Sequence, residues 1–406
     1  MPLRLRIPTT FAPIVALLVA ACADEPTVAP PTTAANPLFA RYVAVGNSIT
    51  AGFQSAGIND STQRRAYPAL LARQMGTDYV YPALAGRGCP PPLADFTTQA
   101  RVGANLGATA STCDLRDPSS LARPLNNVAV PGATSFDPNS ANGPASNTLT
   151  FLVLGGKSQV DRAIDARPTF VTVGIVGNDI LSAVSSGVLV TPAGVPTFTP
   201  PVQYAQNYAA IVNRLRDAGA QGGVLQSTVD LLGTPVVVSS VITQNPQLIQ
   251  VLSVILGVRL TVHPSCTGSR ALFSVELLNR IRSGEHPPIV ACAKNSVPGT
   301  PVGDAFVLDE EEQATVNTAI TQYNTYIRLK ADSLGWAYYD INPTLRELRA
   351  NGNIAQVPDL TSRLTPFGPY MSLDPVHPGN LGHQRIANDL IAIINQKYGT
   401  TLARVP

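Results

Sequence analysis

Short apolar runs alternate with amphipathic segments along most of the chain. Four runs have the composition of strands that are buried on both faces: residues 42–45, 169–175, 223–229 and 336–341. Two segments between them carry apolar residues at helical spacing. One covers residues 204–215 and is followed by Gly219, and the other begins at a capping-box pair, Asp309 and Glu312, and ends at Gly335. This alternation predicts a parallel sheet covered by helices.

The stretch from residue 234 to 304 does not fit this alternation. It contains the run PQLIQVLSVILGVRLTV, which is largely apolar but too short to cross a membrane. We interpret the stretch as an insertion that forms a subdomain or lid beside the sheet. The alternative is an ordinary helix that covers the main core.

The N-terminus has the pattern of an export signal. A basic start is followed by an apolar stretch from Phe11 to Ala21, which is too short for an ordinary transmembrane helix. The small residues before Cys22 resemble the bacterial lipoprotein processing box, in which the cysteine becomes the lipid-modified first residue. The alternative is a plain secretory signal cut near Ala21. The Ala23 that follows is not the aspartate typical of inner-membrane retention, which favours the outer membrane.

The chain is predicted to have three parts. Residues 1–22 form the predicted lipoprotein signal peptide, and residues 23–37, rich in Pro, Thr and Ala, form an extended tether. Residues 38–400 form the folded domain, with the insertion at 234–304. Multiple acyl chains on Cys22 would hold the protein firmly on a membrane of the bacterial cell envelope.

Composition supports an exported globular protein and argues against a nucleic-acid binder. The 406 residues are 45% hydrophobic and 13% charged, enough to bury a sizeable core, and the net charge of +2 leaves no basic surplus for nucleic acid. Apart from Cys22, four cysteines remain, which suggests two disulfides in an exported chain. Proximity favours Cys89 with Cys113 and Cys266 with Cys292 among three connectivities, with unpaired thiols as the alternative. Their spacing offers no recognisable zinc site.

Ser48 lies where the first strand passes into a helical segment, so its hydroxyl can be exposed near unpaired backbone amides. A nucleophilic serine needs a base, and the base needs an orienting group. Asp374 and His377 lie three residues apart in the loop before a C-terminal helix, and we predict that they supply these groups. Of the other histidines, His383 near that helix start is predicted to pack or cap.

Acyl transfer also needs donors for a tetrahedral oxyanion. Gly132 follows a strand-like run, and its backbone can approach a ligand without side-chain hindrance. Asn178 follows the strand at 169–175, at the carboxyl edge of the sheet where ligands bind in open α/β folds. Both are therefore candidate oxyanion residues.

Four blocks in chain order, GNSIT, NVAVPGA, VGNDIL and DPVHP, resemble the SGNH hydrolase superfamily, also called GDSL esterases and lipases. The resemblance implies a flavodoxin-like three-layer α/β/α sandwich with a five-stranded parallel sheet. It implies Ser48 as nucleophile, His377 as base and Asp374 as its orienting group. The backbone amides of Ser48 and Gly132 and the Asn178 side chain would form the oxyanion hole, and no cofactor or metal would be needed.

Two positions depart from the family pattern. Asn47 stands where the family has aspartate, and it keeps an acceptor oxygen without the charge. Val176 stands where the family usually has glycine two residues before its Asn, with Gly174 and Gly177 nearby. Neither departure removes a group that does chemistry.

The expected activity is therefore serine ester hydrolysis through an acyl-enzyme, by a monomer. The apolar insertion, as a possible wall of an acyl pocket, and the membrane anchor favour lipid-like or other acyl esters. The first alternative is an O-acetyl esterase acting on carbohydrate, because the triad would look the same. A non-catalytic surface-binding lipoprotein and an acyltransferase are the others.

Overall fold

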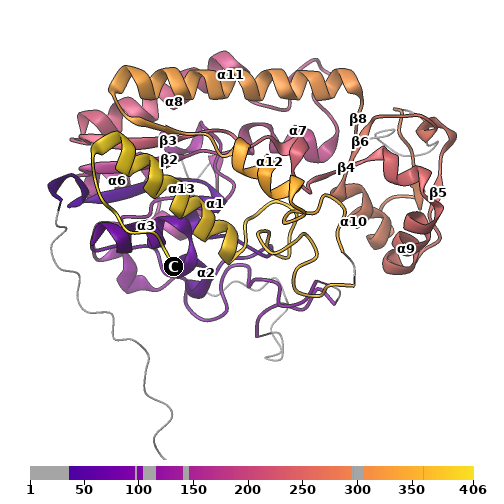
Figure 1. Ribbon diagram of the computed structural model, residues 1–406, viewed down its shortest axis with the longest axis horizontal. Helices are drawn as coiled ribbons and strands as arrows, with labels where there is room; N and C mark the ends of the chain where they lie inside the picture. The colour runs from indigo at the N-terminus through magenta and orange to yellow at the C-terminus, as the bar shows by residue number, and fades with distance from the viewer. Residues whose placement is uncertain are drawn as a thin grey trace, which may run out of the picture.

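A parallel sheet of four strands, in the order β1-β2-β3-β9, lies at the centre of the protein (Figure 1). The computed structural model describes residues 36–96, 98–103, 116–139, 146–294, 296, 306–359 and 361–406. The strands of this sheet are β1 (Tyr42–Gly46), β2 (Phe170–Gly174), β3 (Gly222–Gln226) and β9 (Ala337–Tyr339). Each neighbouring pair is parallel. All four strands predicted from the apolar runs are therefore present.

Helices cover both faces of this sheet because alternate strand residues point in opposite directions. Val43 and Val45 pack into a cluster with helices on one face, and Tyr42 and Ala44 pack with helices on the other. The first face carries α5 (Leu149–Leu154), α6 (Gln159–Asp165), α7 (Asn178–Ser186), α8 (Pro201–Asp217) and α11 (Glu310–Leu334). The second carries α3 (Tyr67–Met75) and α13 (Asn380–Tyr398). The predicted three-layer α/β/α architecture is confirmed.

The predicted count of five strands is wrong. Residues 126–130 run beside β1 and make three backbone hydrogen bonds with it, but only one isolated bridge, between Ala44 and Asn127, is formed. The next bridge would need the Gly46 amide to donate to the Val128 carbonyl, but that amide donates to Gln159 Oε1 at 3.0 Å instead. The Gln159 side chain thus takes the donor that would extend the parallel ladder. The fifth position is therefore occupied by an extended segment.

The two amphipathic helices predicted from spacing are confirmed as α8 and α11. At the start of α11, Asp309 Oδ1 accepts from the Glu312 amide at 2.9 Å, and Glu312 Oε2 accepts from the Asp309 amide at 3.1 Å. Gly335, with φ of 67°, ends this helix in the left-handed conformation. The remaining short helices near the sheet are α1 (Ser48–Ala51), α2 (Asp60–Arg65) and α12 (Asn342–Ala350).

Residues 234–294, with β8 (Val307–Leu308), form a separate unit at one end of the molecule, which we call the satellite (Figure 1). It has its own apolar cluster and the disulfide between Cys266 and Cys292. An antiparallel sheet joins β4 (Val237–Ser239), β6 (Leu272–Ser274) and β8, and a two-stranded sheet joins β5 (Thr261–Val262) and β7 (Ile289–Val290). The satellite helices are α9 (Pro246–Leu256) and α10 (Val275–Ser283).

Helix α9 does not cover the central sheet. Its one buried residue, Leu252, belongs to the apolar cluster of the satellite, where Leu248 and Ile249 also pack. In Figure 1 the helix lies far from α1, which carries Ser48, along the longest axis of the molecule. The expectation that this run lines an acyl pocket is therefore wrong, because the run packs on its own subdomain.

Several predictions concern residues outside the described ranges. The signal peptide, Cys22 and nearly all of the tether lie in residues 1–35. Cys89 is disulfide-bonded, but its expected partner Cys113 also lies outside these ranges, so that pairing stays a prediction. In the part of the chain that the structure describes, no helix is both long and apolar enough to cross a membrane.

Candidate active site

Ser48 is the first residue of α1, directly after the strand β1. The intervening Asn47 is the N-cap, and its side chain accepts from the Ile49 amide at 3.4 Å, a role that needs an oxygen and no charge. Gly46 is required by space, because a Cβ there would lie 2.2 Å from Thr50 Oγ1. The turn thus places Ser48 at the carboxyl edge of the sheet.

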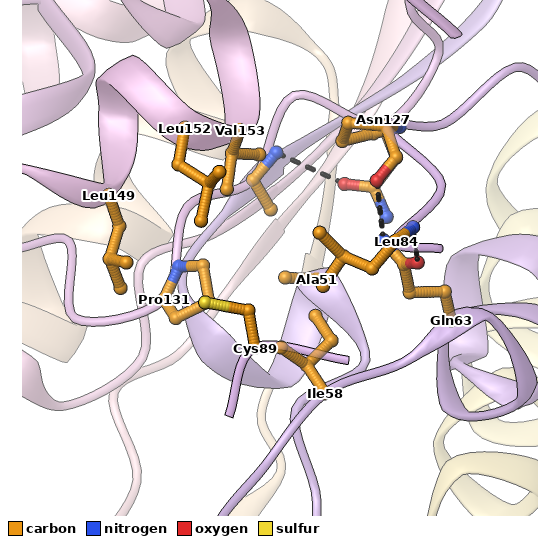
Figure 2. Close-up of a pocket in the computed structure, with 12 residues that line it drawn as sticks. Ala51, Ile58, Gln63, Leu84, Cys89, Asn127, Pro131, Leu149, Leu152 and Val153 are labelled. Atoms are coloured by element: carbon orange, nitrogen blue, oxygen red, sulfur yellow. Dashed lines mark hydrogen bonds between the residues drawn. The ribbon is translucent and has the colours of Figure 1, made fainter. Parts of the chain in front are cut away.

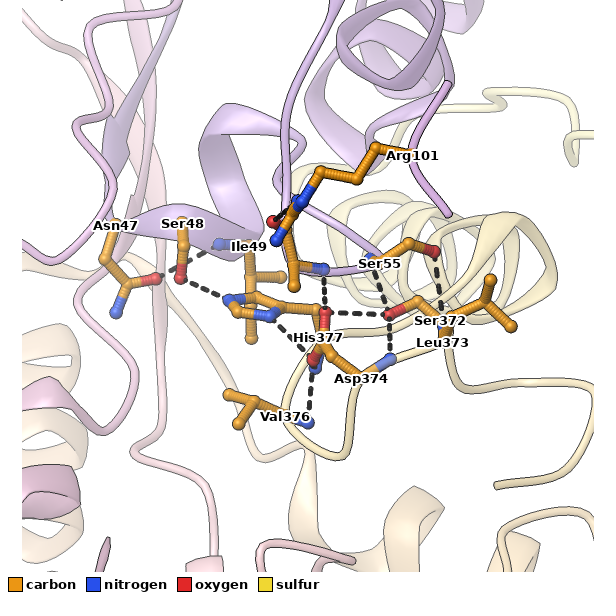
Figure 3. Close-up of polar contacts among 11 residues, drawn as sticks. Asn47, Ser48, Ile49, Ser55, Arg101, Ser372, Leu373, Asp374, Val376 and His377 are labelled. Atoms are coloured by element: carbon orange, nitrogen blue, oxygen red, sulfur yellow. Dashed lines mark hydrogen bonds and ion pairs between the residues drawn. The ribbon is translucent and has the colours of Figure 1, made fainter. Parts of the chain in front are cut away.

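Three side chains from distant parts of the sequence form a continuous hydrogen-bonded chain (Figure 3). Ser48 Oγ lies 2.9 Å from His377 Nε2, and His377 Nδ1 lies 2.9 Å from Asp374 Oδ1. An ionised carboxylate can only accept, so Nδ1 must carry its proton when the ring is neutral. Nε2 is then the acceptor for the Ser48 hydroxyl, which is the arrangement in which an imidazole can act as a base toward serine.

The Asp374 carboxylate is held by several donors. Oδ1 accepts from the amides of Val376 and His377 at 2.9 and 2.8 Å, and Oδ2 accepts from the Ala56 amide at 2.7 Å and from Ser372 Oγ at 3.1 Å. Burial raises the pKa of Asp374, but the interaction with His377 and the backbone amides outweigh it and lower the pKa to about 2. The group is therefore an anion at neutral pH.

We expect this carboxylate to make the stability of the fold pH-dependent. A folded-state pKa of about 2, against an ordinary value of 3.8 for an aspartate, gives stabilisation that is nearly complete above about pH 4 and is lost as the pH falls toward 2. The shift corresponds to roughly 2 kcal/mol. Urea unfolding of the wild type and Asp374→Asn between pH 6 and 2.5 measures it. The difference in unfolding free energy should shrink by roughly two thirds of that amount, since the pH stays above the folded pKa, and a pH-independent difference would refute the assignment.

Asp374 is supported by a segment, Ser55 and Ala56, that no pattern in the sequence predicts. Ser55 and Ala56 have φ of 57° and 50°, in the left-handed region that residues other than glycine rarely adopt. This conformation aims the Ala56 amide at Asp374, while the Ser55 amide donates to Ser372 Oγ at 2.8 Å. Strain of this kind persists where surrounding contacts over-determine it. Nothing in a serine–alanine pair signals it in advance.

Other side chains fix the position of the imidazole and of its neighbours. The Phe53 ring lies 4.8 Å from the His377 ring, centroid to centroid. His383 packs as predicted: it is fully buried, its Nδ1 accepts from the Tyr67 amide at 3.3 Å, and burial lowers its pKa to about 3. It is a structural residue of the α3–α13 layer, separate from the Ser48–His377 pair.

The two further oxyanion candidates, Gly132 and Asn178, lie close together. Asn178 is the first residue of α7, and its Nδ2 donates to the Ala133 carbonyl at 2.9 Å, next to Gly132. Gly132 has φ of 80°, and Gly177, the N-cap of α7, has φ of 114°. Glycine at 177 thus supplies the backbone freedom that the family usually has from a glycine at the position of Val176. Within the described ranges, no acceptor is bonded to the backbone amides of Ser48 or Gly132.

A small apolar cavity adjoins both candidate catalytic segments (Figure 2). Ala51 of α1, three residues after Ser48, lines it on one side, and Pro131, directly before Gly132, lines it on another. Leu149 and Leu152 of α5 contribute further apolar surface. Among the described residues, no group of three His, Cys, Asp or Glu side chains is placed to hold a metal ion.

Comparison with known proteins identifies the family. The model of the GDSL-like lipase/acylhydrolase family matches residues 42–390. No curated protein matches the chain significantly.

Among solved structures, the chain is similar to an extracellular lipase from Streptomyces rimosus, with 16% identity, 87% of this chain and 98% of that chain covered, and a TM-score of 0.37. A catalytic mutant of an acetylxylan esterase from Geobacillus stearothermophilus is also similar, with 10% identity, coverage of 90% and 96%, and a TM-score of 0.37.

Proposed function

The chain belongs to the GDSL-like lipase/acylhydrolase family and is a hydrolase that acts on esters, and from this premise we propose that it is a serine carboxylic-ester hydrolase. The observation that supports this mechanism best is the continuous hydrogen-bonded chain from Ser48 through His377 to Asp374, 2.9 Å at each link. Residues 329 positions apart are brought into that contact. In our proposal Ser48 is the nucleophile, His377 the base and Asp374 the orienting group.

The proposed reaction has two halves. Ser48 Oγ attacks the acyl carbon while His377 Nε2 accepts the hydroxyl proton, and that proton then passes to the leaving alcohol as the ester C–O bond breaks. Water attacks the resulting acyl-enzyme, again with His377 as base, and the acid leaves as Ser48 regains its proton. Asp374 stays ionised and stabilises the imidazolium that forms in each half. We assign the oxyanion to the amides of Ser48 and Gly132 and the Asn178 side chain.

Removing the proposed side-chain donor should slow turnover selectively. We expect Asn178→Ala to lower kcat by on the order of a hundred- to a thousand-fold, because one donor to the transition-state oxyanion is lost. Steady-state kinetics on a soluble ester measures it, with Asn213→Ala on α8 as the control, because Asn213 accepts from Lys330 on α11, away from this site. Full kcat in folded Asn178→Ala would remove this residue from the oxyanion hole.

We propose simple acyl esters as the substrate class, because the matching family comprises lipases and acylhydrolases. The cavity beside α1 and Pro131 is mostly apolar but holds only about 10 Å³, so it does not accommodate an acyl chain. A panel of 4-nitrophenyl esters of increasing acyl length tests the proposal. We expect kcat/KM to rise beyond acetate, whereas activity on acetate alone would favour the carbohydrate O-acetyl esterase instead. Wild-type turnover no higher than that of Ser48→Ala would favour a non-catalytic binding protein.

We also propose that Cys22 carries lipid and anchors the protein to the cell envelope, in the outer membrane. The support comes from the basic and apolar segment and the small residues before Cys22. Metabolic labelling with a palmitate analogue should mark the wild type and not Cys22→Ser. Equal labelling of both would contradict the proposal.

A further inference from the structure

Helix α9 exposes apolar side chains at the outer end of the satellite. Its eleven residues include no charged side chain, and Leu252 is the only one that is buried. Val251 is 47% exposed and Val254 is 77% exposed, on adjacent turns. We call the side of α9 that carries these two valines the α9 face. Val241, 57% exposed, lies in the 3-10 helix Ser240–Gln244, just before α9 in the chain.

The satellite also contains exposed arginines that make no ion pair within the described ranges. Arg259 lies three residues after the end of α9, and together with Arg270 and Arg282 it is exposed and makes no ion pair within the described ranges. The two carboxylates of residues 234–294, Glu276 and Glu285, are both paired with Arg280. Five cations and two carboxylates give this segment a formal charge of +3, compared with +2 for the entire chain. The satellite therefore carries the basic surplus of the protein.

We propose that the α9 face docks on an anionic lipid surface. Helices that combine exposed apolar residues with neighbouring cations lie in the membrane interface, where apolar burial and attraction to anionic headgroups add together. Each arginine near such a surface adds attraction that salt weakens. The inference is separate from the ester chemistry and from lipid on Cys22, because it rests only on residues of the satellite.

A second copy of the chain fits this face less well. A two-fold interface centred on α9 would bring together two satellites that each carry a formal charge of +3, and like charges across an interface oppose association. An anionic membrane instead offers the opposite charge to the exposed arginines. Docking there would also keep the membrane away from Ser48, since α9 and α1 lie far apart along the longest axis of the molecule (Figure 1).

A local fluorescent probe tests the proposal on the full chain. In a Cys22→Ser background, Val254→Cys is labelled with an environment-sensitive fluorophore and titrated with phosphatidylglycerol or phosphatidylcholine vesicles. The matched control is Val202→Cys on α8, which is 73% exposed and outside the satellite. Both labelled proteins keep the apolar N-terminal segment. If that segment alone bound the vesicles, the probes at positions 254 and 202 would respond alike. Unchanged thermal unfolding of each variant shows that the fold is retained.

We expect a blue shift at position 254 with phosphatidylglycerol, a much weaker one with phosphatidylcholine, and none at position 202. Replacing Arg259, Arg270 and Arg282 with glutamine should raise the lipid concentration at half-maximal shift by on the order of a hundredfold. No shift at position 254 with phosphatidylglycerol, or an equal shift with both lipids, would overturn the proposal. A shift at position 254 that depends on protein concentration without lipid would overturn it in favour of a dimer.

Discussion

Ser48→Ala is expected to lower kcat on a soluble ester by on the order of a million-fold. The substitution removes the one atom placed to attack the acyl carbon while leaving the 47–51 turn with a good helix-forming residue. The Asn47 cap and the glycine at 46 are untouched, so the thermal unfolding midpoint should change little. Single-turnover and steady-state kinetics on a 4-nitrophenyl ester measure the loss.

The matched control for this variant is Ser333→Ala. Ser333 lies on α11 and donates to the Lys330 carbonyl at 2.8 Å, away from the site. It should keep the wild-type kcat. A folded Ser48→Ala protein within about tenfold of wild type would show that another group attacks the ester.

Asp374→Asn is expected to lower kcat by on the order of ten-thousand-fold. The carboxylate uses both oxygens as acceptors, with Ala56 bonded to one and His377 to the other. An amide replaces one of these acceptors with a donor, so it either loses the Ala56 amide or faces His377 Nδ1 with an N–H group. The second arrangement favours the tautomer with its proton on Nε2, which cannot accept the proton of Ser48.

The control for Asp374→Asn is Asp359→Asn, which changes an exposed carboxylate that accepts only local bonds from Thr361. The kcat of this control should be unchanged. If Asp374→Asn folds and keeps kcat within about tenfold of wild type, Asp374 does not set the tautomer of His377.

The elements that could be predicted from the sequence are those set by residues close together in the chain. The apolar runs gave the four strands, because strands covered on both faces leave a continuous apolar signature. The capping pair Asp309 and Glu312 located the start of α11, since that bond is made between residues three apart. The positions of Ser48 and His377 at strand and helix boundaries were visible for the same reason.

Features that depend on distant contacts were not predictable in this way. The strand-like run at 126–130 fails to form a ladder because the Gln159 side chain takes the Gly46 amide, a contact between residues 113 positions apart that composition does not reveal. The apolar sequence of α9 suggested that this helix lines an acyl pocket at the active site. In the structure it packs instead against the apolar cluster of the satellite. The left-handed backbone conformations of Ser55 and Ala56 are set by Ser372 and Asp374, which lie 317 and 318 positions further along the chain.

The proposal that Ser48 is the nucleophile is tested most directly by covalent labelling. The wild-type protein is reacted with a fluorophosphonate, digested, and mapped by mass spectrometry, with Asp374→Asn reacted in parallel. The account predicts one adduct, on the peptide that contains Ser48, formed together with loss of ester turnover and much more slowly in Asp374→Asn. An adduct on another residue that abolishes turnover, or ester turnover that persists after Ser48 is fully labelled, would contradict it.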